Sequence, residues 1–499
     1  MTKGFDPKFA KFEFHQTDWG SRGLPLFKEK LKELEPLFYP KSIAVVGVSS
    51  TSIKVGSVWV SALLSAGFPG PIYPVGSGGG KIFNLEIFPS LRLVPGDVDY
   101  VIVAIPRRSV LELLDDCIIK KVKAVQFFTA GFSETGTPEG YKLEEQMLEK
   151  ARQGGIRIIG PNCIGLYCPE HKMTSLLGKI GETGPVGFIS QSGGIAGKLI
   201  EIGIARHINY SKGVSFGNGI DLDASDFLQY MAADPKTKVI GAYLEGTRKG
   251  ARLFNTIKEV AKVKPLVVWK GGRTEVGAQA AMSHTGSLAS SAAIWSAMFR
   301  QAGAIEVNNL EELTDTLLIF QQLNCWQGTS IAIIGGLADG GGGISVSASD
   351  ACLESGLRVP LLSLETKQEL GKLLGEVGSI LRNPVDVSQA RGMANLFKAI
   401  DLVARDTVID IILIQEDIDI LSPIYGQKGL EEINEFFMEL RNRHNKPVII
   451  VLPPGSAEPE RLQIEQKLLP ASVPVFCSME RAAKAIYKLN QYSCWQEAK

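Results

Sequence analysis

A chain of 499 residues with 53 lysines and arginines against 53 aspartates and glutamates has no formal net charge, so no overall field attracts it to nucleic acid or to an anionic membrane. Its hydrophobic content of 45% is that of a globular protein and excludes disordered and collagen-like chains. Its seven cysteines are widely spread and form no CxxC pair, which argues against a disulfide framework and against a zinc site.

Residues 1–35 are expected to form an amino-terminal extension. This segment mixes charged and aromatic residues, lacks the apolar centre of a signal peptide and ends in the charged helical pattern LFKEKLKELEPLF. No apolar run elsewhere reaches the length of a membrane span. We therefore expect a cytoplasmic protein with no membrane and no nucleic acid among its partners.

Residues 36–180 predict a Rossmann-like domain. Short apolar runs, such as SIAVVGVSS, VDYVIVAIP and IRIIG, alternate with helical patterns such as YKLEEQMLEKARQG. Strands that alternate with helices form βαβ units and a buried parallel sheet. Two similar series follow, over 181–326 and 327–499, and both lack a dinucleotide glycine fingerprint. The sequence therefore predicts an α/β protein with one Rossmann-like domain and two flavodoxin-like domains.

The strand ends of the first domain suit a ligand that bears phosphate, since ligands of doubly wound sheets sit where the strands end. Gly47 and Ser49 follow the first strand, with Lys54 nearby, and can bring backbone N–H groups and a positive charge to a phosphate. The loop after the second strand ends in Lys81, where an NAD site needs an acid. This pattern favours a ligand with a pyrophosphate and an extra ribose phosphate. The alternative is a glycine-rich turn with solvated basic side chains.

The last strand of this domain runs into the turn Gly160-Pro161-Asn162-Cys163. The rigid backbone of this turn and the Asn162 amide could fix a polar group of a ligand. Cys163 would lie beside that group, although an isolated cysteine is more often structural than reactive.

The second domain carries three features that are typical of phosphoryl chemistry. The segment SQSGG places Ser192, Gly193 and Gly194 at the start of a helix, where hydroxyl and N–H groups cradle a phosphate, although a simple tight turn uses the same residues. Glu245 ends an apolar strand and is either a solvated acid or the partner of a catalytic imidazole. His284 lies in AMSHTGSLASS, among small residues that leave room for an incoming group.

Three interpretations of His284 compete: a satisfied surface or core histidine, a metal ligand and a nucleophile. No second histidine or cysteine lies at ligand spacing, so a metal site is not predicted. A neutral imidazole is nucleophilic near pH 7. The predicted helix starts on either side of the His284 segment can bind phosphate. We therefore expect a phosphohistidine.

The motifs of this chain occur in a recognisable order. SIAVVGVSS, VIVAIP, FFTAGF, GPNCIG, GFISQSGG, VSFGNGIDLDASDFLQYM, YLEG and KGGRTEVGAQAAMSHTGSLAS follow one another from about residue 36. In this ordered set the chain resembles the alpha subunit of NDP-forming acyl-CoA synthetases (acetate–CoA ligase, ADP-forming), within the succinyl-CoA synthetase superfamily.

The resemblance implies roles for individual residues. His284 would be transiently phosphorylated, with Glu245 as its partner. No metal site is implied on this chain. The phosphate would be held with the help of Ser192, Gly193 and Gly194, and the first domain would bind coenzyme A through Gly47, Ser49, Lys54, Gly56, Pro74, Lys81, Pro106, Thr129, Ala130, Gly131, Asn162 and Cys163.

The resemblance also implies the reaction. Members of this family convert acyl-CoA, ADP and phosphate to a carboxylic acid, ATP and CoA through an acyl phosphate and a phosphohistidine, and each step is reversible. No ATP-grasp module is visible in this sequence, so full turnover would need a separate ATP-grasp beta subunit, most simply in an α2β2 assembly. That partner would bind ADP or ATP and Mg2+.

Two other functions stay open at this point. A CoA-binding regulatory or scaffold protein would bind CoA without any phosphorylation. A nicotinamide-dependent oxidoreductase is suggested by the Rossmann pattern alone, and the missing acid after the second strand counts against it.

Overall fold

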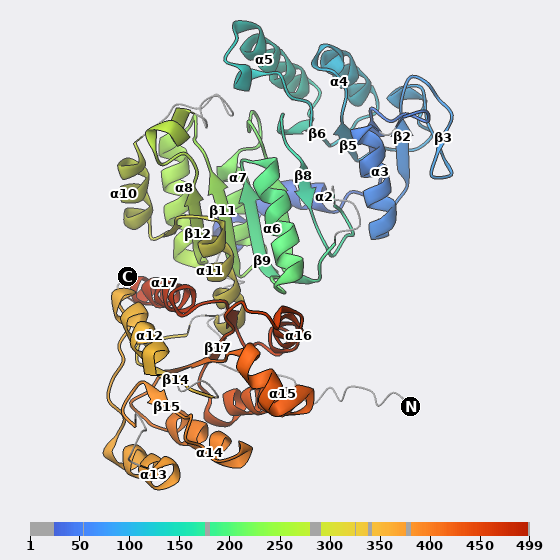
Figure 1. Cartoon of the computed structure of the whole chain (residues 1–499). Helices are drawn as coiled ribbons and strands as arrows, with labels where there is room; N and C mark the ends of the chain where they lie inside the picture. Colours follow the sequence, from blue (N-terminus) through green and yellow to red (C-terminus); the bar gives the residue numbers. More distant parts are fainter. Residues whose placement is uncertain are drawn as a thin grey trace. The chain divides into compact units, whose positions relative to one another are not determined.

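The computed structural model describes residues 24–497, except 53, 175–179, 280–290, 325, 338–341 and 376–380. Over the described residues the chain forms two compact units: the first comprises residues 24–321 with 494–497, and the second comprises residues 322–493. Three mainly parallel sheets with helices between their strands confirm the predicted α/β fold class (Figure 1). The finer division at residues 35, 180 and 326 stays a prediction.

The first sheet has the strand order β2-β1-β5-β6-β7, and all of its strands are parallel. The order changes direction at β1, because β2 lies on one side of it and β5 on the other. The last residues of β1 and β5, Val46 and Val103, are aligned, so the switch point at which such sheets bind ligands lies just beyond them. The elements are β1 Ile43–Val46, α3 Val55–Ala66, β2 Ile72–Val75, β5 Tyr100–Val103, α4 Val110–Ile119, β6 Ala124–Phe127, α5 Pro138–Gln153 and β7 Arg157–Ile159, with a hairpin of β3 Lys81–Ile82 and β4 Leu85–Glu86 after β2.

The second sheet has the order β13-β12-β11-β9-β10-β8. Its edge strand β8 (Gly165–Tyr167) is antiparallel to β10, so residues before the predicted boundary at 180 pair with strands of the second series. The order changes direction at β9, which has β10 on one side and β11 on the other, and this is its switch point. The other elements are β9 Thr183–Ser190, α6 Gly193–Ala205, β10 Tyr210–Ser215, α7 Ala224–Ala233, β11 Val239–Leu244, α8 Gly250–Val263, β12 Leu266–Lys270, α10 Ala292–Ala302, β13 Ile305–Val307 and α11 Leu310–Leu323.

The helix α2 (Leu24–Phe38) is part of the first unit and packs against α7. The ring of Phe38 stacks on that of Tyr230, with centroids 4.7 Å apart. The helix therefore contributes a hydrophobic face to the core of the unit. The predicted extension ends inside this helix, at residue 35.

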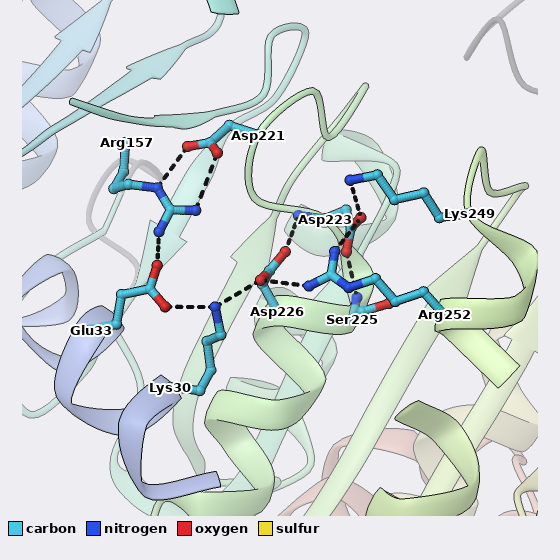
Figure 2. Close-up of polar contacts among 9 residues, drawn as sticks. All are labelled: Lys30, Glu33, Arg157, Asp221, Asp223, Ser225, Asp226, Lys249 and Arg252. Carbon is cyan, nitrogen blue, oxygen red and sulfur yellow. Dashed lines mark hydrogen bonds and ion pairs between the residues drawn. The ribbon is translucent and has the colours of Figure 1, made fainter. Parts of the chain in front are cut away.

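An ion-pair network joins α2 to β7 of the first sheet and to α7, which packs on β9 and β11 of the second sheet (Figure 2). Arg157 of β7 donates to Asp221, with Nε 2.8 Å from Oδ2, and it also pairs with Glu33 of α2. Lys30 of α2 donates to Asp226 of α7 at 2.9 Å. Because its members come from α2, from the last strand of the first sheet and from the segment that starts α7, the network holds the two sheets in one unit.

Asp226 is the centre of this network. It closes a capping box with Asp223 at the start of α7 and accepts from Arg252 of α8 at 2.7 Å. Burial by itself raises the pKa of this carboxyl, but the hydrogen bonds from Arg252 and Lys30 outweigh that effect and lower the pKa to about 2. Asp226 therefore remains ionised at any pH at which the protein works.

The second unit contains a parallel sheet with the order β15-β14-β16-β17-β18. Among the described residues, no helix of the chain is long and apolar enough to cross a membrane. The helices and strands of the second unit are β14 Ile331–Gly335, α12 Gly342–Glu354, α13 Leu364–Leu374, β15 Val385–Asp386, α14 Met393–Ala404, β16 Ile411–Gln415, α15 Ile418–His444, β17 Val448–Val451, α16 Glu458–Leu468 and β18 Val475–Phe476. The final helix, α17 Met479–Glu497, begins in this unit, and its residues from Cys494 onward are assigned to the first unit.

Glu416, directly after β16, is a buried acid. Its exposed fraction is 1%, and neither carboxyl oxygen has a hydrogen-bond partner in the part of the chain that the structure describes. Burial raises the pKa of Glu416 to about 8, because a charged carboxylate there would lose its hydration without compensation. Glu416 is therefore protonated in the folded protein at neutral pH.

The raised pKa of Glu416 predicts that stability falls as the pH rises. Between about pH 5 and 8 the unfolded chain releases this proton and the folded chain keeps it, so the free energy of unfolding decreases by roughly 1 kcal/mol per pH unit and levels off above pH 8. Glu416→Gln removes the titration, and its stability relative to the natural protein should grow over this pH range. Denaturant unfolding at pH 5.5, 6.5 and 7.5 measures this difference, and parallel profiles of the two proteins would contradict it.

Candidate functional site

The switch point of the first sheet is built on two glycines that no other residue could replace without movement. Gly47 follows β1 with φ +105°, and a Cβ there would lie 2.3 Å from the carbonyl oxygen of Ala104. A Cβ on Gly56, in the first turn of α3, would lie 2.7 Å from the carbonyl oxygen of Gly47. The start of α3 therefore lies close to the loop after β1, and the first N–H groups of a helix have no intrahelical acceptor and suit an anion.

The other residues predicted for this loop surround the same helix start. Ser49 accepts the N–H of Thr51 at 3.3 Å, which holds the loop in a turn, and the exposed Lys54 directly precedes α3. The exposed Lys81 begins the β3–β4 hairpin, and a Cβ on the preceding Gly80 would lie 3.1 Å from Ser50 Oγ. The hairpin thus lies against the Ser49 loop. Pro74 differs from these residues, because it is buried within β2 and aligned with Val45 of β1.

The turn Thr129–Gly131 lies at the end of β6, beside the segment that follows β5. Thr129 Oγ1 donates to the carbonyl oxygen of Ile105 at 2.8 Å, next to the exposed Pro106, and Arg107 Nη1 donates to that of Gly131 at 2.6 Å. Glu134 accepts the N–H of Gly131 at 2.5 Å. These bonds fix the turn and leave the side chain of Ala130 exposed to solvent.

The turn Gly160–Cys163 is joined to the preceding one. The N–H of Asn162 donates to the carbonyl oxygen of Thr129 at 3.0 Å. Cys163 is 2% exposed, and its Sγ donates to the carbonyl oxygen of Phe127 at 3.5 Å. Burial raises the pKa of the Cys163 thiol to about 12, so the thiol stays protonated and is a packing group rather than a nucleophile.

A loop of the second sheet lies on both turns. After β10, the N–H of Asn218 donates to the carbonyl oxygen of Pro161 at 3.0 Å, and its Nδ2 donates to Glu134 Oε2 at 2.7 Å. Sequence reasoning assigned no role to Asn218 or Glu134. A usable signal was the pattern Gly217-Asn218-Gly219, in which two glycines flank a polar residue directly beyond a strand.

The predicted phosphate cradle and the predicted carboxylate meet at the switch point of the second sheet. Ser192 caps α6, with its Oγ accepting the N–H of Ile195 at 3.4 Å. The neighbouring Gln191 side chain accepts the N–H groups of Glu245 and Gly246 at 2.7 and 3.0 Å. One side chain thus connects the loop after β9 to the loop after β11, and sequence reasoning did not identify it.

A buried lysine adds positive charge to this edge. Lys270 ends β12, aligned with Leu244 at the end of β11, and is 4% exposed. Burial lowers the pKa of Lys270, and the negative charge of Glu245 opposes that effect. For Tyr243, burial and then the Glu245 carboxylate raise the pKa. Glu245 therefore lies close to both side chains, and the edge presents an acid and a base in a region shielded from water.

His284 lies outside the described residues. The connection that contains it leaves β12 at Lys270 and enters α10 at Ala292, so it starts from the same edge of the sheet as Glu245. Within the ranges that the structure describes, no group of three or more His, Cys, Asp or Glu side chains could hold a metal ion.

Comparisons with known proteins cover both sheets. Residues 41–169 match the family model of a CoA binding domain, and residues 183–320 match that of a succinyl-CoA ligase like flavodoxin domain. The alpha subunit of acetate–CoA ligase [ADP-forming] I from Pyrococcus furiosus is 34% identical over 93% of this chain and 98% of that protein. Acetate–CoA ligase [ADP-forming] I from Archaeoglobus fulgidus is 34% identical over 92% of this chain and 64% of that longer protein.

A solved structure is similar over the same extent. It is that of the dinucleotide forming acetyl-coenzyme A synthetase 1 from Ca. Korarchaeum cryptofilum in complex with phosphate and ADP. Its TM-score is 0.80 at 30% sequence identity, and the likeness covers 93% of this chain and 97% of that chain.

The contacts of Gln191 predict a stability difference between two substitutions. Gln191→Leu leaves the N–H groups of Glu245 and Gly246 without an acceptor and should lower the free energy of unfolding by about 1–3 kcal/mol. Gln191→Glu keeps an acceptor of the same length and should retain most of the stability. Urea unfolding of both variants measures the difference, and equal losses would show that the two hydrogen bonds do not hold the loop.

Proposed function

The chain belongs to the family of ADP-forming acetate–CoA ligase alpha subunits, and on this premise we propose that it catalyses the acyl and phosphoryl steps of that reaction. Acyl-CoA, ADP and phosphate are interconverted with a carboxylic acid, ATP and CoA. The relatives give no support to a regulatory or scaffold function. The single observation that carries the proposal is that both switch points, with their helix starts, belong to one unit joined at Asn218.

Coenzyme A is the ligand of the first switch point. Its pyrophosphate suits the start of α3, where the close approach of Gly47 and Gly56 leaves no room for a Cβ and keeps backbone N–H groups accessible. Lys54 and Lys81, both exposed, supply charge for the phosphates. The turns Thr129–Gly131 and Gly160–Cys163 receive the arm that ends in the thiol. Of the remaining assigned residues, Ser49 and Pro106 shape the loops around these positions, and Pro74 is buried within β2.

The second switch point performs the phosphoryl chemistry. Phosphate oxygen attacks the thioester carbonyl, the CoA thiolate leaves, and an acyl phosphate results. A ring nitrogen of His284 then attacks the phosphorus, and the carboxylate leaves. Ser192, Gly193 and Gly194 hold the phosphoryl oxygens at the start of α6, and Glu245 stabilises the cationic imidazole. Lys270 is buried beside Glu245 and adds a positive charge that favours an anion there.

A beta subunit completes the reaction. The Pyrococcus furiosus relative is named as an alpha subunit, and this chain spans 64% of the longer Archaeoglobus fulgidus relative. We assign to the beta subunit an ATP-grasp fold, the binding of ADP and Mg2+, and a place in an α2β2 assembly. The phosphohistidine is the group that passes between the two subunits.

Phosphorylation of His284 is the direct test. The natural chain, incubated with acetyl-CoA and phosphate, should gain the mass of one phosphoryl group, and the label should be lost in acid. His284→Ala should gain none. His207→Asn is the matched control, since His207 has φ +51°, a conformation that asparagine tolerates, and this variant should be labelled normally. Intact-mass measurement determines the phosphorylation of the natural chain and of both variants.

Glu245→Gln refines the test. It retains the shape of the side chain but removes the charge, so labelling should slow by about tenfold or more, as expected when an imidazolium loses its carboxylate partner. Labelling that persists in His284→Ala, or a natural chain that no acyl-CoA labels, would contradict the proposed function.

A further inference from the structure

Asn218 occupies the contact between the two sheets. It lies between Gly217 (φ +53°) and Gly219 (φ +60°) in the loop that follows β10. A Cβ on Gly217 would lie 2.2 Å from the carbonyl oxygen of Pro161 and 2.4 Å from that of Asn162, so only glycine allows this approach. The second sheet therefore inserts Asn218 directly over the turn Gly160–Cys163.

The orientation of the Asn218 amide follows from its partners. Nδ2 lies 2.7 Å from Glu134 Oε2 and 3.3 Å from Glu144 Oε2. Carboxylates accept hydrogen bonds, so the amide nitrogen must face them and the amide oxygen must face away. Since Glu134 also accepts the N–H of Gly131 at 2.5 Å, the nitrogen side of Asn218 supports the Thr129–Gly131 turn.

The oxygen side of Asn218 has no partner among the residues that the structure describes. Asn218 is 7% exposed, and its Oδ1 makes no hydrogen bond to any residue that the structure describes. A buried acceptor without a donor costs about 1–3 kcal/mol, and native sites that keep such an acceptor generally fill it with a ligand or an ordered water. A donor is therefore expected at this position.

The ligand proposed for this region carries few donors near its reactive end. The phosphates of coenzyme A only accept hydrogen bonds, whereas its pantetheine arm contains two secondary amides, each with one N–H, and one hydroxyl farther from the thiol than both amides. This arm is the part that the turns beneath Asn218 receive in the proposed function. Two carboxylates hold the nitrogen side of the Asn218 amide, so its Oδ1 stays oriented as an acceptor. It would accept an N–H of the arm and hold the arm in one position.

On these grounds we propose that Asn218 Oδ1 accepts a hydrogen bond from a pantetheine amide N–H of coenzyme A, so that the second sheet positions the acyl-carrying arm. The inference rests on the proposed function and adds a specificity residue that comes from outside the CoA binding domain at 41–169. Asn218 affects how tightly coenzyme A binds and where its pantetheine arm lies, and no covalent bond to Asn218 forms or breaks.

Titration calorimetry of the full chain tests the inference with two ligands. Asn218→Ala should weaken binding of coenzyme A by about tenfold, the effect of one hydrogen bond to a buried acceptor. Adenosine 3′,5′-bisphosphate lacks the arm, so its binding should change by less than about twofold on the same scale. Retained binding of this smaller ligand also shows that the variant is folded.

Ser133→Ala is the matched control. Its hydroxyl lies 3.4 Å from Asn218 Nδ2, on the nitrogen side of the same amide, and its removal should leave the affinity for coenzyme A nearly unchanged. Coenzyme A analogues in which an ester oxygen replaces one amide N–H give the sharper measurement. One of the two analogues should bind the natural chain about tenfold more weakly than coenzyme A does. The Asn218→Ala variant should bind that analogue and coenzyme A with the same affinity.

Three outcomes would overturn the inference. Equal weakening of coenzyme A and the bisphosphate by Asn218→Ala would show that Asn218 acts only by supporting the turns. Ester analogues that bind the natural chain as tightly as coenzyme A would show that neither pantetheine amide donates to Oδ1. A natural chain that binds the bisphosphate and coenzyme A equally well would show that the arm makes no contact at all. Failure of the natural chain to bind either ligand would instead contradict the proposed function itself.

Discussion

The contact between the Gly217–Gly219 loop and the Gly160–Cys163 turn is the constraint on which the rest of the site depends. Two backbone bonds, Asn218 N–H to Pro161 and Ile220 N–H to Gly160, join the loop after β10 to the end of β7. Because a Cβ on Gly217 would overlap the turn, the contact tolerates only glycine. It fixes the carboxyl ends of two mainly parallel sheets in one unit, and we propose that a ligand on the first sheet lies within reach of groups on the second.

Charge is distributed over this unit according to burial. The buried carboxylate of Asp226 stays ionised because Arg252 and Lys30 compensate the cost of burial, and the ion pairs tie α2, α7 and α8 together. At the switch point of the second sheet, Glu245 directly follows β11 and Lys270 ends the neighbouring strand β12; burial lowers the pKa of Lys270, and the charge of Glu245 opposes that effect. The first arrangement supports the fold, and we propose that the second supports the chemistry.

Local sequence signals explain the parts of the site that were predicted. The glycines at 47 and 56 and the serine cap at 192 act through backbone geometry and helix starts, which a sequence pattern reveals directly. Gln191, Asn218 and Lys270 were missed because their roles depend on which loops the fold brings together. Cys163 was expected near a ligand, and its position under the turn makes its thiol a packing group. The sequence predicted a helix at the end of the extension, and α2 lies there, but its packing against α7 depends on the tertiary fold and could not be predicted from the pattern.

Hydrogen–deuterium exchange of the full chain with and without coenzyme A tests most directly whether the two sheets form one binding site. Our account predicts that coenzyme A slows exchange together in residues 129–134 and 160–163 of the first sheet and in residues 216–220 of the second. Protection that is confined to the first sheet, with residues 216–220 exchanging as fast as in the free chain, would contradict a site that both sheets share.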